Sequence, residues 1–235
     1  MRSILILLTF CVVVSCVGPK KIQRKLNKDK YSTLLIKHVS SNFTSFDKTL
    51  TLNIIDNSQL REETTVDKEY GDVRNFIVAA SWDYTSTITL GRNSFKPELV
   101  KLVEKTFIEE SIKTGNYSIS EVDKSEFNIT ISIDSCNVNA EYITSGGSSG
   151  SANYQNHDLK PSKGVIKLNI KLYGKENLLI FENDYFSNST SRVSISKYDY
   201  NKDIYKKISL LLTKTLSDCL ANQMPIIVKD INNSL

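Results

Sequence analysis

The first residue whose type and position suggest chemistry is Cys16, a thiol at the end of an apolar segment. Arg2 supplies one positive charge, residues 4–14 are apolar except for Thr9, and the small residue Ser15 comes directly before the cysteine. This order is typical of a secretory signal, and the run is shorter than the roughly 20 apolar residues that span a bilayer. The pattern predicts cleavage before Cys16 and modification of its sulfur.

The block Val13-Val14-Ser15-Cys16 resembles the lipobox of bacterial lipoproteins, in which an aliphatic residue, a tolerant position and a small residue precede a cysteine. The resemblance implies a lipoprotein signal peptide over residues 1–15, a diacylglyceryl group on the Cys16 thiol and an acyl chain such as palmitate on the new amine. Two or three acyl chains hold a protein on a membrane firmly, whereas one holds it only marginally. An ordinary cleaved signal peptide and an uncleaved anchor are the alternatives.

The same resemblance implies a place in the bacterial cell envelope, with the membrane as a partner through the lipid anchor. Val17 follows the cysteine, at the position where some bacteria use an aspartate to retain lipoproteins in the inner membrane. The sequence therefore favours the outer membrane, with the chain facing the periplasm.

A basic segment comes next. From Val17 to Lys30, six Lys and Arg residues are opposed only by Asp29, which predicts a solvated tether over residues 16–30 that could extend up to roughly 50 Å. Contact with anionic lipid is the alternative for this charge. Residues 31–235 are expected to form a single α/β globular domain. The net charge of +4, with acidic residues scattered throughout, is a poor signature of nucleic-acid binding.

Alternating and β-branched runs predict the strands of this domain. The clearest is residues 127–138, where isoleucines alternate with polar residues. The other expected strands are 32–39, 49–55, a hairpin of 75–80 with 85–90 around 81–84, a second hairpin of 165–173 with 178–186, and a short strand over 226–228. Charge-rich residues 61–72 are expected to be a surface loop, and the Ser- and Gly-rich residues 142–164 a long flexible loop.

Two segments have apolar residues at helical spacing. One begins near Pro97 and ends at Gly115, and the other runs from about Lys202 to Asn222 before Pro225 stops it. Two helices with one apolar stripe each need a common sheet to cover. The predicted fold class is therefore α+β: an α/β sandwich, with a mixed β-sheet and both amphipathic helices packed on one face.

The remaining cysteines of the mature chain are Cys136 in a predicted strand and Cys219 in a predicted helix. Export would permit a disulfide between them. Two separate buried thiols are the alternative, because cysteine is a common core residue. Either way, the two residues could meet only where a helix packs on the sheet.

The other reactive side chains show no recognisable catalytic arrangement. His38 and His157 lack metal-ligand spacing, and no phosphate-binding or nucleophile motif occurs, so neither a metal nor a cofactor is expected. Three aspartates (Asp56, Asp83 and Asp134) remain without an assigned role. A pair of carboxylates could serve a hydrolase, but turn capping and contact with solvent are the simpler interpretations.

Trp82 and Tyr84 lie where a hairpin tip is predicted. Aromatic side chains at such a tip could anchor an interaction with a partner. As the only tryptophan of the chain, Trp82 is instead favoured as a core residue.

The order of elements resembles that of a group of envelope lipoproteins: the YajG-type lipoproteins, the auxiliary lipoproteins of ABC transporters and, more distantly, the periplasmic domains of curli secretion lipoproteins and of penicillin-binding-protein activators. The matching features are a strand that ends in Asp56, a helix that ends in Gly115-Asn116-Tyr117, the strand over 127–138, the hairpin over 165–186 and the late helix with residues 216–220. The group often has an arginine close behind the aspartate that ends the strand, whereas here Asn57-Ser58-Gln59-Leu60 intervenes between Asp56 and Arg61. The chain also departs from the group because residues 73–93 look like an extra hairpin.

These observations favour a non-enzymatic, membrane-anchored envelope lipoprotein that binds a protein or lipid-handling partner, as an accessory of transport or envelope assembly. The first alternative is a subunit of an oligomeric secretion complex, which the curli resemblance and the two predicted hairpins suggest. The second alternative is a lipid-anchored hydrolase that uses the unassigned carboxylates. The oligomeric state does not follow from the sequence.

Overall fold

The computed structural model of the chain describes residues 19–28, 48–75, 79–92, 98–120, 125–149, 152–195 and 201–235. The predicted signal peptide, Cys16, His38 and the strand expected over 32–39 lie outside these residues. The described elements are α2 (Pro19–Lys28), β1 (Thr49–Asp56), β2 (Thr65–Asn75), β3 (Ala79–Thr89), α3 (Leu99–Thr114), β4 (Ser118–Ser120), β5 (Phe127–Ser149), β6 (Ala152–Leu159), β7 (Ser162–Tyr173), η2 (Lys175–Asn177), β8 (Leu179–Ser191) and α4 (Asn201–Ser234).

The protein is a mixed α+β structure with an eight-stranded, mostly antiparallel sheet. Its organising element is β5, which is 23 residues long. The first part of β5 pairs with β1 in parallel and with β7 antiparallel, and its second part pairs antiparallel with β3 and with β6. Beyond these neighbours, β4 lies beside β1, β2 beside β3, and β8 beside β7.

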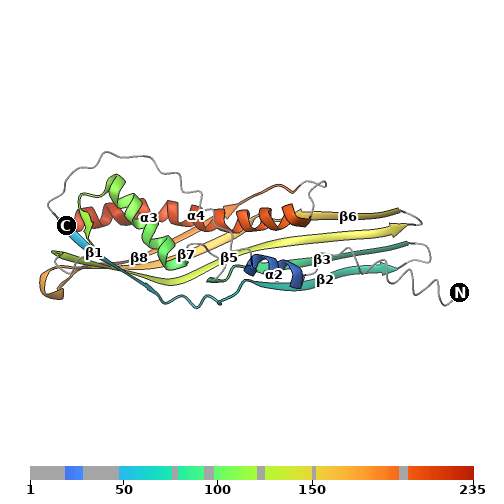
Figure 1. Cartoon of the computed structure of the whole chain (residues 1–235), viewed down its shortest axis with the longest axis horizontal. Coiled ribbons are helices and arrows are strands. Elements are labelled where there is room, and N and C mark those ends of the chain that lie inside the picture. The colour runs from blue at the N-terminus through green and yellow to red at the C-terminus, as the bar shows by residue number, and fades with distance from the viewer. Residues whose placement is uncertain are drawn as a thin grey trace.

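The long central strand gives the molecule two regions (Figure 1). We call "body" the strands β4, β1, β7 and β8 with residues 127–138 of β5, together with α3 and α4. We call "extension" the four strands formed by β2, β3, residues 139–149 of β5, and β6. Figure 1 shows the strands of the extension running on past the start of α4, so the molecule is elongated.

The core of the body confirms the strand and helix that were predicted most clearly. Ile129, Ile131 and Ile133 of β5 are completely buried, and α4 lies along β8, β7 and β5. Burying one such side chain contributes about 1.5–3 kcal/mol relative to leaving it exposed. The apolar stripe of α3 contributes Phe107 and Val103, which are also completely buried.

The sequence predicted that the last helix would stop before Pro225 and that a short strand would form over 226–228. Both predictions are wrong. Instead α4 spans 34 residues with Pro225 inside it. A proline inside a helix costs about 3 kcal/mol because it removes a backbone donor and its ring crowds the preceding turn. Met224, Ile227 and Val228 are all buried around it. Burial of three apolar side chains at about 1.5 kcal/mol or more each outweighs that cost.

The expectation of a flexible loop over residues 142–164 is wrong. Residues 142–149, 152–159 and 162–164 form the end of β5, all of β6 and the start of β7. The glycines have a packing reason: a Cβ at Gly146 would lie 2.4 Å from the Trp82 ring, and one at Gly147 would lie 2.6 Å from the Tyr154 hydroxyl. Glycine therefore lets an aromatic ring lie across the neighbouring strand, a known device for strands that contain glycine.

The predicted surface loop over 61–72 is also wrong in its second half, since β2 begins at Thr65. Likewise, residues 81–84 are not a hairpin tip, because β3 runs straight through them. The two strands pair from Thr65 opposite Thr89 to Asn75 opposite Ala80. The connection between them falls at residues 76–78, outside the described residues.

Part of the predicted tether is a packed helix. In α2, Ile22 is completely buried and Leu26 is 3% exposed. The Asn27 amide forms a two-way contact with Thr64, accepting from its backbone N–H at 2.9 Å and donating to its carbonyl at 3.3 Å. Two apolar side chains four residues apart are enough to dock one face of a short helix. The prediction of a solvated tether rested on the lysines and overlooked these two residues.

Candidate interaction surface

The extension has two long outer edges. Within the described residues, no strand pairs with the outer side of β2 or of β6. In β6 the direction of the free N–H groups follows from the ladder. The Lys160 N–H donates to the Glu141 carbonyl. Along an antiparallel ladder, hydrogen-bonded residue pairs alternate with pairs whose N–H groups point outward. The N–H groups of Gln155 and His157 therefore point away from β5.

Aromatic rings gather on one face of the extension. The rings of Trp82 and Tyr84 stack with centroids 5.6 Å apart, and Lys68 Nζ lies 3.8 Å from the Tyr84 centroid and 4.2 Å from that of Tyr70. Tyr84 is only 4% exposed, whereas Tyr70 is 75% exposed. The two predicted interaction residues thus lie in mid-strand, and the exposed aromatic residue beside them is one that the sequence analysis did not single out.

A polar layer lies beneath the start of α4. The hydroxyls of Ser86, Thr144 and Tyr205 are buried and have no hydrogen-bond partner among the described residues. Burial, with the nearby Tyr84, raises the pKa of Tyr205 to about 12. A buried polar group without a partner costs about 1–3 kcal/mol. The contact between the extension and α4 therefore carries a cost that burial of apolar side chains must offset.

His157 belongs to this surface and not to a loop. Its ring stacks on Tyr142 at 5.7 Å, and its Nδ1 lies 2.5 Å from the Tyr142 hydroxyl. Burial lowers the pKa of His157, so the folded state favours the neutral ring. The neutral ring can accept the Tyr142 proton at Nδ1, which a protonated ring cannot.

The opposite face of the extension is polar. Its strands present exposed carboxylates, and between them lie threonine and serine side chains of β3 and β5. The carboxylates belong to Asp67, Glu69, Asp83, Glu141 and Asp158. Tyr154 is an exception on this face, 55% exposed on β6. The two outermost strands, β2 and β6, therefore each carry one exposed tyrosine.

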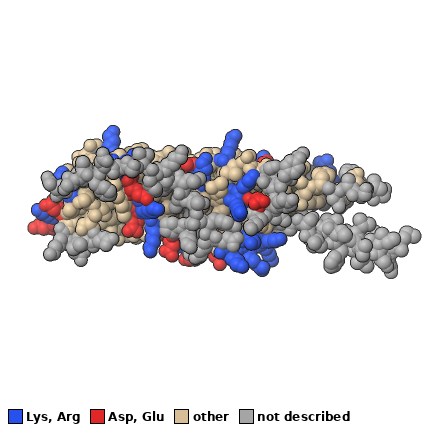
Figure 2. All heavy atoms as spheres, turned by 45° about the horizontal axis from the view of Figure 1, so that its top comes forward, with Lys and Arg blue, Asp and Glu red and all other residues tan. Residues whose placement is uncertain are grey.

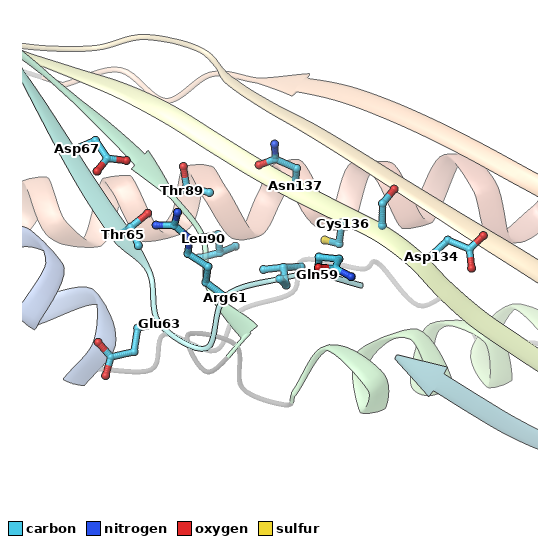
Figure 3. A pocket seen from close by; sticks show the side chains of 12 residues that line it. Gln59, Arg61, Glu63, Thr65, Asp67, Thr89, Leu90, Asp134, Cys136 and Asn137 are labelled. Atoms are coloured by element: carbon cyan, nitrogen blue, oxygen red, sulfur yellow. The ribbon is translucent and has the colours of Figure 1, made fainter. Parts of the chain in front are cut away.

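A cavity of about 350 Å³ lies between body and extension, where β1 leaves β5 and β3 joins it (Figure 3). Figure 3 shows Arg61, Glu63 and Asp67 on one side of this hollow, with Asp134 and Cys136 on the other. Asp134 forms an ion pair with Lys167 at 3.4 Å. Among the described residues, no three His, Cys, Asp or Glu side chains are grouped to hold a metal ion.

The three unassigned aspartates do not form one site. The Asp56 carboxylate accepts from the Ser58 N–H at 2.9 Å and pairs with Arg92 at 3.4 Å. It thus ties the end of β1 to the residues that follow β3, and Arg92 rather than Arg61 supplies its cation. Asp83 pairs in register with Ser145, eleven positions beyond Asp134 along β5, or roughly 35 Å.

Cys136 and Cys219 are both free and buried. Burial, together with the nearby Cys219, raises the pKa of Cys136 to about 12, and burial raises that of Cys219 to about 11. The Cys219 sulfur lies 3.2 Å from where a Cβ of Gly164 would be. The thiols therefore lie near each other between the sheet and α4, protonated at neutral pH, and a disulfide between them stays a prediction.

Comparisons with known proteins gave no relative. No family model matches the chain, and no similar protein was found among curated sequences or solved structures. None of the described helices is long and apolar enough to cross a membrane.

Proposed function

We propose that this protein is a non-enzymatic lipoprotein of the bacterial envelope, anchored through Cys16, that acts as a subunit of an oligomeric secretion complex. Its subunits join when β6 of one copy pairs with β2 of the next. The expected accessory role, binding a protein partner near the outer membrane, is thereby kept, with a second copy of the chain as the first partner.

The observation that carries the proposal is the pair of open edges on the extension. The strand β2 has 11 residues and β6 has 8, which is long for strands that stand at the edge of a sheet. An unpaired strand edge is a template for another strand. The charged residues of β2, such as Asp67 and Lys68, discourage indiscriminate pairing.

Strand direction supports head-to-tail pairing. Since β2 is antiparallel to β3, and β3 and β6 are both antiparallel to β5, β2 and β6 run in opposite directions. A β6 strand placed beside the β2 strand of another copy therefore continues an antiparallel sheet, with every extension pointing the same way. Such a heterologous contact closes into a ring when its rotation permits. It also leaves every lipid anchor on the same side of the assembly.

The layered architecture of the body is part of this proposal. We propose an α/β sandwich with α3 and α4 on one face of the sheet. Support comes from the contacts of α4 with β5, β7 and β8 and of α3 with α4 and β1. In this arrangement α3 and α4 leave the outer sides of β2 and β6 open, whereas α2 packs against β2.

A proline on the free side of β6 tests the proposal. Gln155→Pro removes an N–H that points away from β5, so the monomer keeps its ladder, and proline is tolerated at such edge positions. We expect the lipidated native protein to form oligomers in detergent by light scattering, and the variant to be monomeric with a melting temperature within a few degrees. Gln155→Ala is the matched control and should assemble. A native protein that is monomeric, or a proline variant that assembles normally, would contradict the proposal.

A further inference from the structure

We infer that α2 binds the surface of an anionic phospholipid bilayer and fixes the orientation of the body on the membrane. This inference rests on the proposed lipid anchor at Cys16. It adds a second membrane contact, made by side chains, to the one made by the acyl chains.

The two sides of α2 have opposite character. Ile22 and Leu26 face the protein and are buried. All the cationic side chains of the helix are exposed, and no acidic residue interrupts them. These cations are Lys20, Lys21, Arg24, Lys25 and Lys28. Figure 2 shows blue side chains gathered where α2 lies in Figure 1, a denser group than elsewhere on that view.

The helix is held rigidly, so its charges are presented as a fixed group. The side chain of Asn27 binds the backbone of Thr64 in both directions, directly before β2. Because the apolar residues of α2 are used for docking on the protein, they are not available for insertion into lipid. Its contact with a bilayer is therefore electrostatic, and salt should weaken it.

The position of the anchor brings this helix to the membrane. Pro19, the first residue of α2, is only three residues after Cys16, so the two Cα atoms are at most about 11 Å apart. A lipidated Cys16 lies at the level of the headgroups. With the helix axis along the membrane, the cations of α2 would then lie within about one Debye length of an anionic surface. Each such cation strengthens binding roughly fivefold.

Vesicle binding tests the inference without the lipid anchor. The probe protein is the mature chain, residues 16–235, carrying Cys16→Ala, and the probe surfaces are phosphatidylglycerol–phosphatidylcholine vesicles and pure phosphatidylcholine vesicles. We expect binding to the anionic vesicles at low salt, its loss at high salt, and no binding to phosphatidylcholine. In the first variant, glutamine replaces Lys20, Lys21, Arg24 and Lys28, and the affinity should fall at least tenfold.

A matched control separates position from net charge. Glutamine at the exposed body residues Lys101, Lys113, Lys163 and Lys175 removes the same charge and should change the affinity by less than threefold. Equal losses in both variants, binding to phosphatidylcholine, or no binding to anionic vesicles would overturn the inference. Circular dichroism must show that both variants are folded. Palmitate labelling of Cys16 and the Gln155→Pro test address the proposed function separately, since Gln155→Pro should leave vesicle binding unchanged.

Discussion

The two parts of β5 differ although they belong to one continuous strand. In the body, three isoleucines in alternation are completely buried, and both sides of the strand are paired. In the extension, the same strand continues with glycine, serine and threonine, and its inner face packs on aromatic rings and unpartnered hydroxyls. Among the described strands, the extension also ends in two edges without a partner strand.

This difference teaches that the two regions obtain their stability in different ways. Burial within one chain is enough to explain the body, because many of its apolar side chains are completely buried. The extension has fewer such side chains, and the hydroxyls of Ser86 and Thr144 are buried in it without partners among the described residues. Its edges gain hydrogen bonds only when another strand is added, which is what the proposed assembly supplies.

The largest effect is expected from a deletion in the body. Ile131→Ala should lower the free energy of unfolding by about 2–5 kcal/mol, the usual cost of truncating a fully buried isoleucine. Ile143→Ala, further along the same strand and only partly buried, should cost about 1 kcal/mol or less. Urea titration followed by circular dichroism gives both values. Equal losses at the two positions would break the distinction between the regions.

A smaller effect is expected where glycine makes room for an aromatic ring. Gly146→Val would place a side chain 2.4 Å or less from the Trp82 ring and should cost about 1–3 kcal/mol through overpacking. Trp82 is the only tryptophan, so its fluorescence reports on the extension directly. Ser145→Val, one position away, is the control and should be nearly neutral. A neutral Gly146→Val would show that the ring does not lie against the glycine.

The polar layer should respond in the opposite direction. Thr144→Val replaces a buried hydroxyl that has no partner in the described part of the chain with a methyl group of similar shape, and should stabilise the extension by about 1 kcal/mol. Ser162→Ala is the contrasting variant, because its hydroxyl donates to the Asn139 carbonyl at 2.8 Å. It should destabilise by about 1 kcal/mol. Thermal melting followed by Trp82 fluorescence and by circular dichroism measures both, and a destabilised Thr144→Val would contradict the account.

The smallest effect concerns pH. The pKa of His157 is lowered by burial in the folded state, so the stability that its neutral ring contributes is complete above the unfolded value of about 6.5 and is lost as the pH falls below it. The melting temperature reported by Trp82 should decrease from pH 7.5 to 5.5. His157→Phe keeps a ring beside Tyr142 but cannot titrate, so its decrease should be smaller. If the melting temperatures of the native protein and of His157→Phe changed identically with pH, His157 would not be the source of the pH dependence.

Much of the body could be predicted from the sequence. Apolar residues that repeat with the period of a strand or helix indicate its buried face. Such patterns occur at Ile129, Ile131 and Ile133 and at Leu99, Val103 and Phe107. The hairpin of β7 and β8 was predicted for the same reason.

The strands of the extension were not all predicted, because they lack a clear alternation of apolar and polar residues. Gly146 and Gly147 signal a loop when read alone, and their reason for being in a strand, the rings of Trp82 and Tyr154, lies elsewhere in the chain. The charges of β2 concealed a strand with one exposed face, and the lysines of α2 concealed the two residues that dock it. The partner of Asp56, Arg92, follows an inserted hairpin that sequence spacing cannot bridge.

The most direct test of the central claim is crosslinking between the outer strands of different copies. One variant carries Glu69→Cys on β2 and another carries Asn156→Cys on β6, both exposed on the same face of the extension. A short bismaleimide is added to each variant alone and to a mixture of the two reassembled in detergent. Head-to-tail pairing predicts crosslinked dimers in the mixture and almost none in either variant alone. Dimers from one variant alone, or none in the mixture, would contradict it.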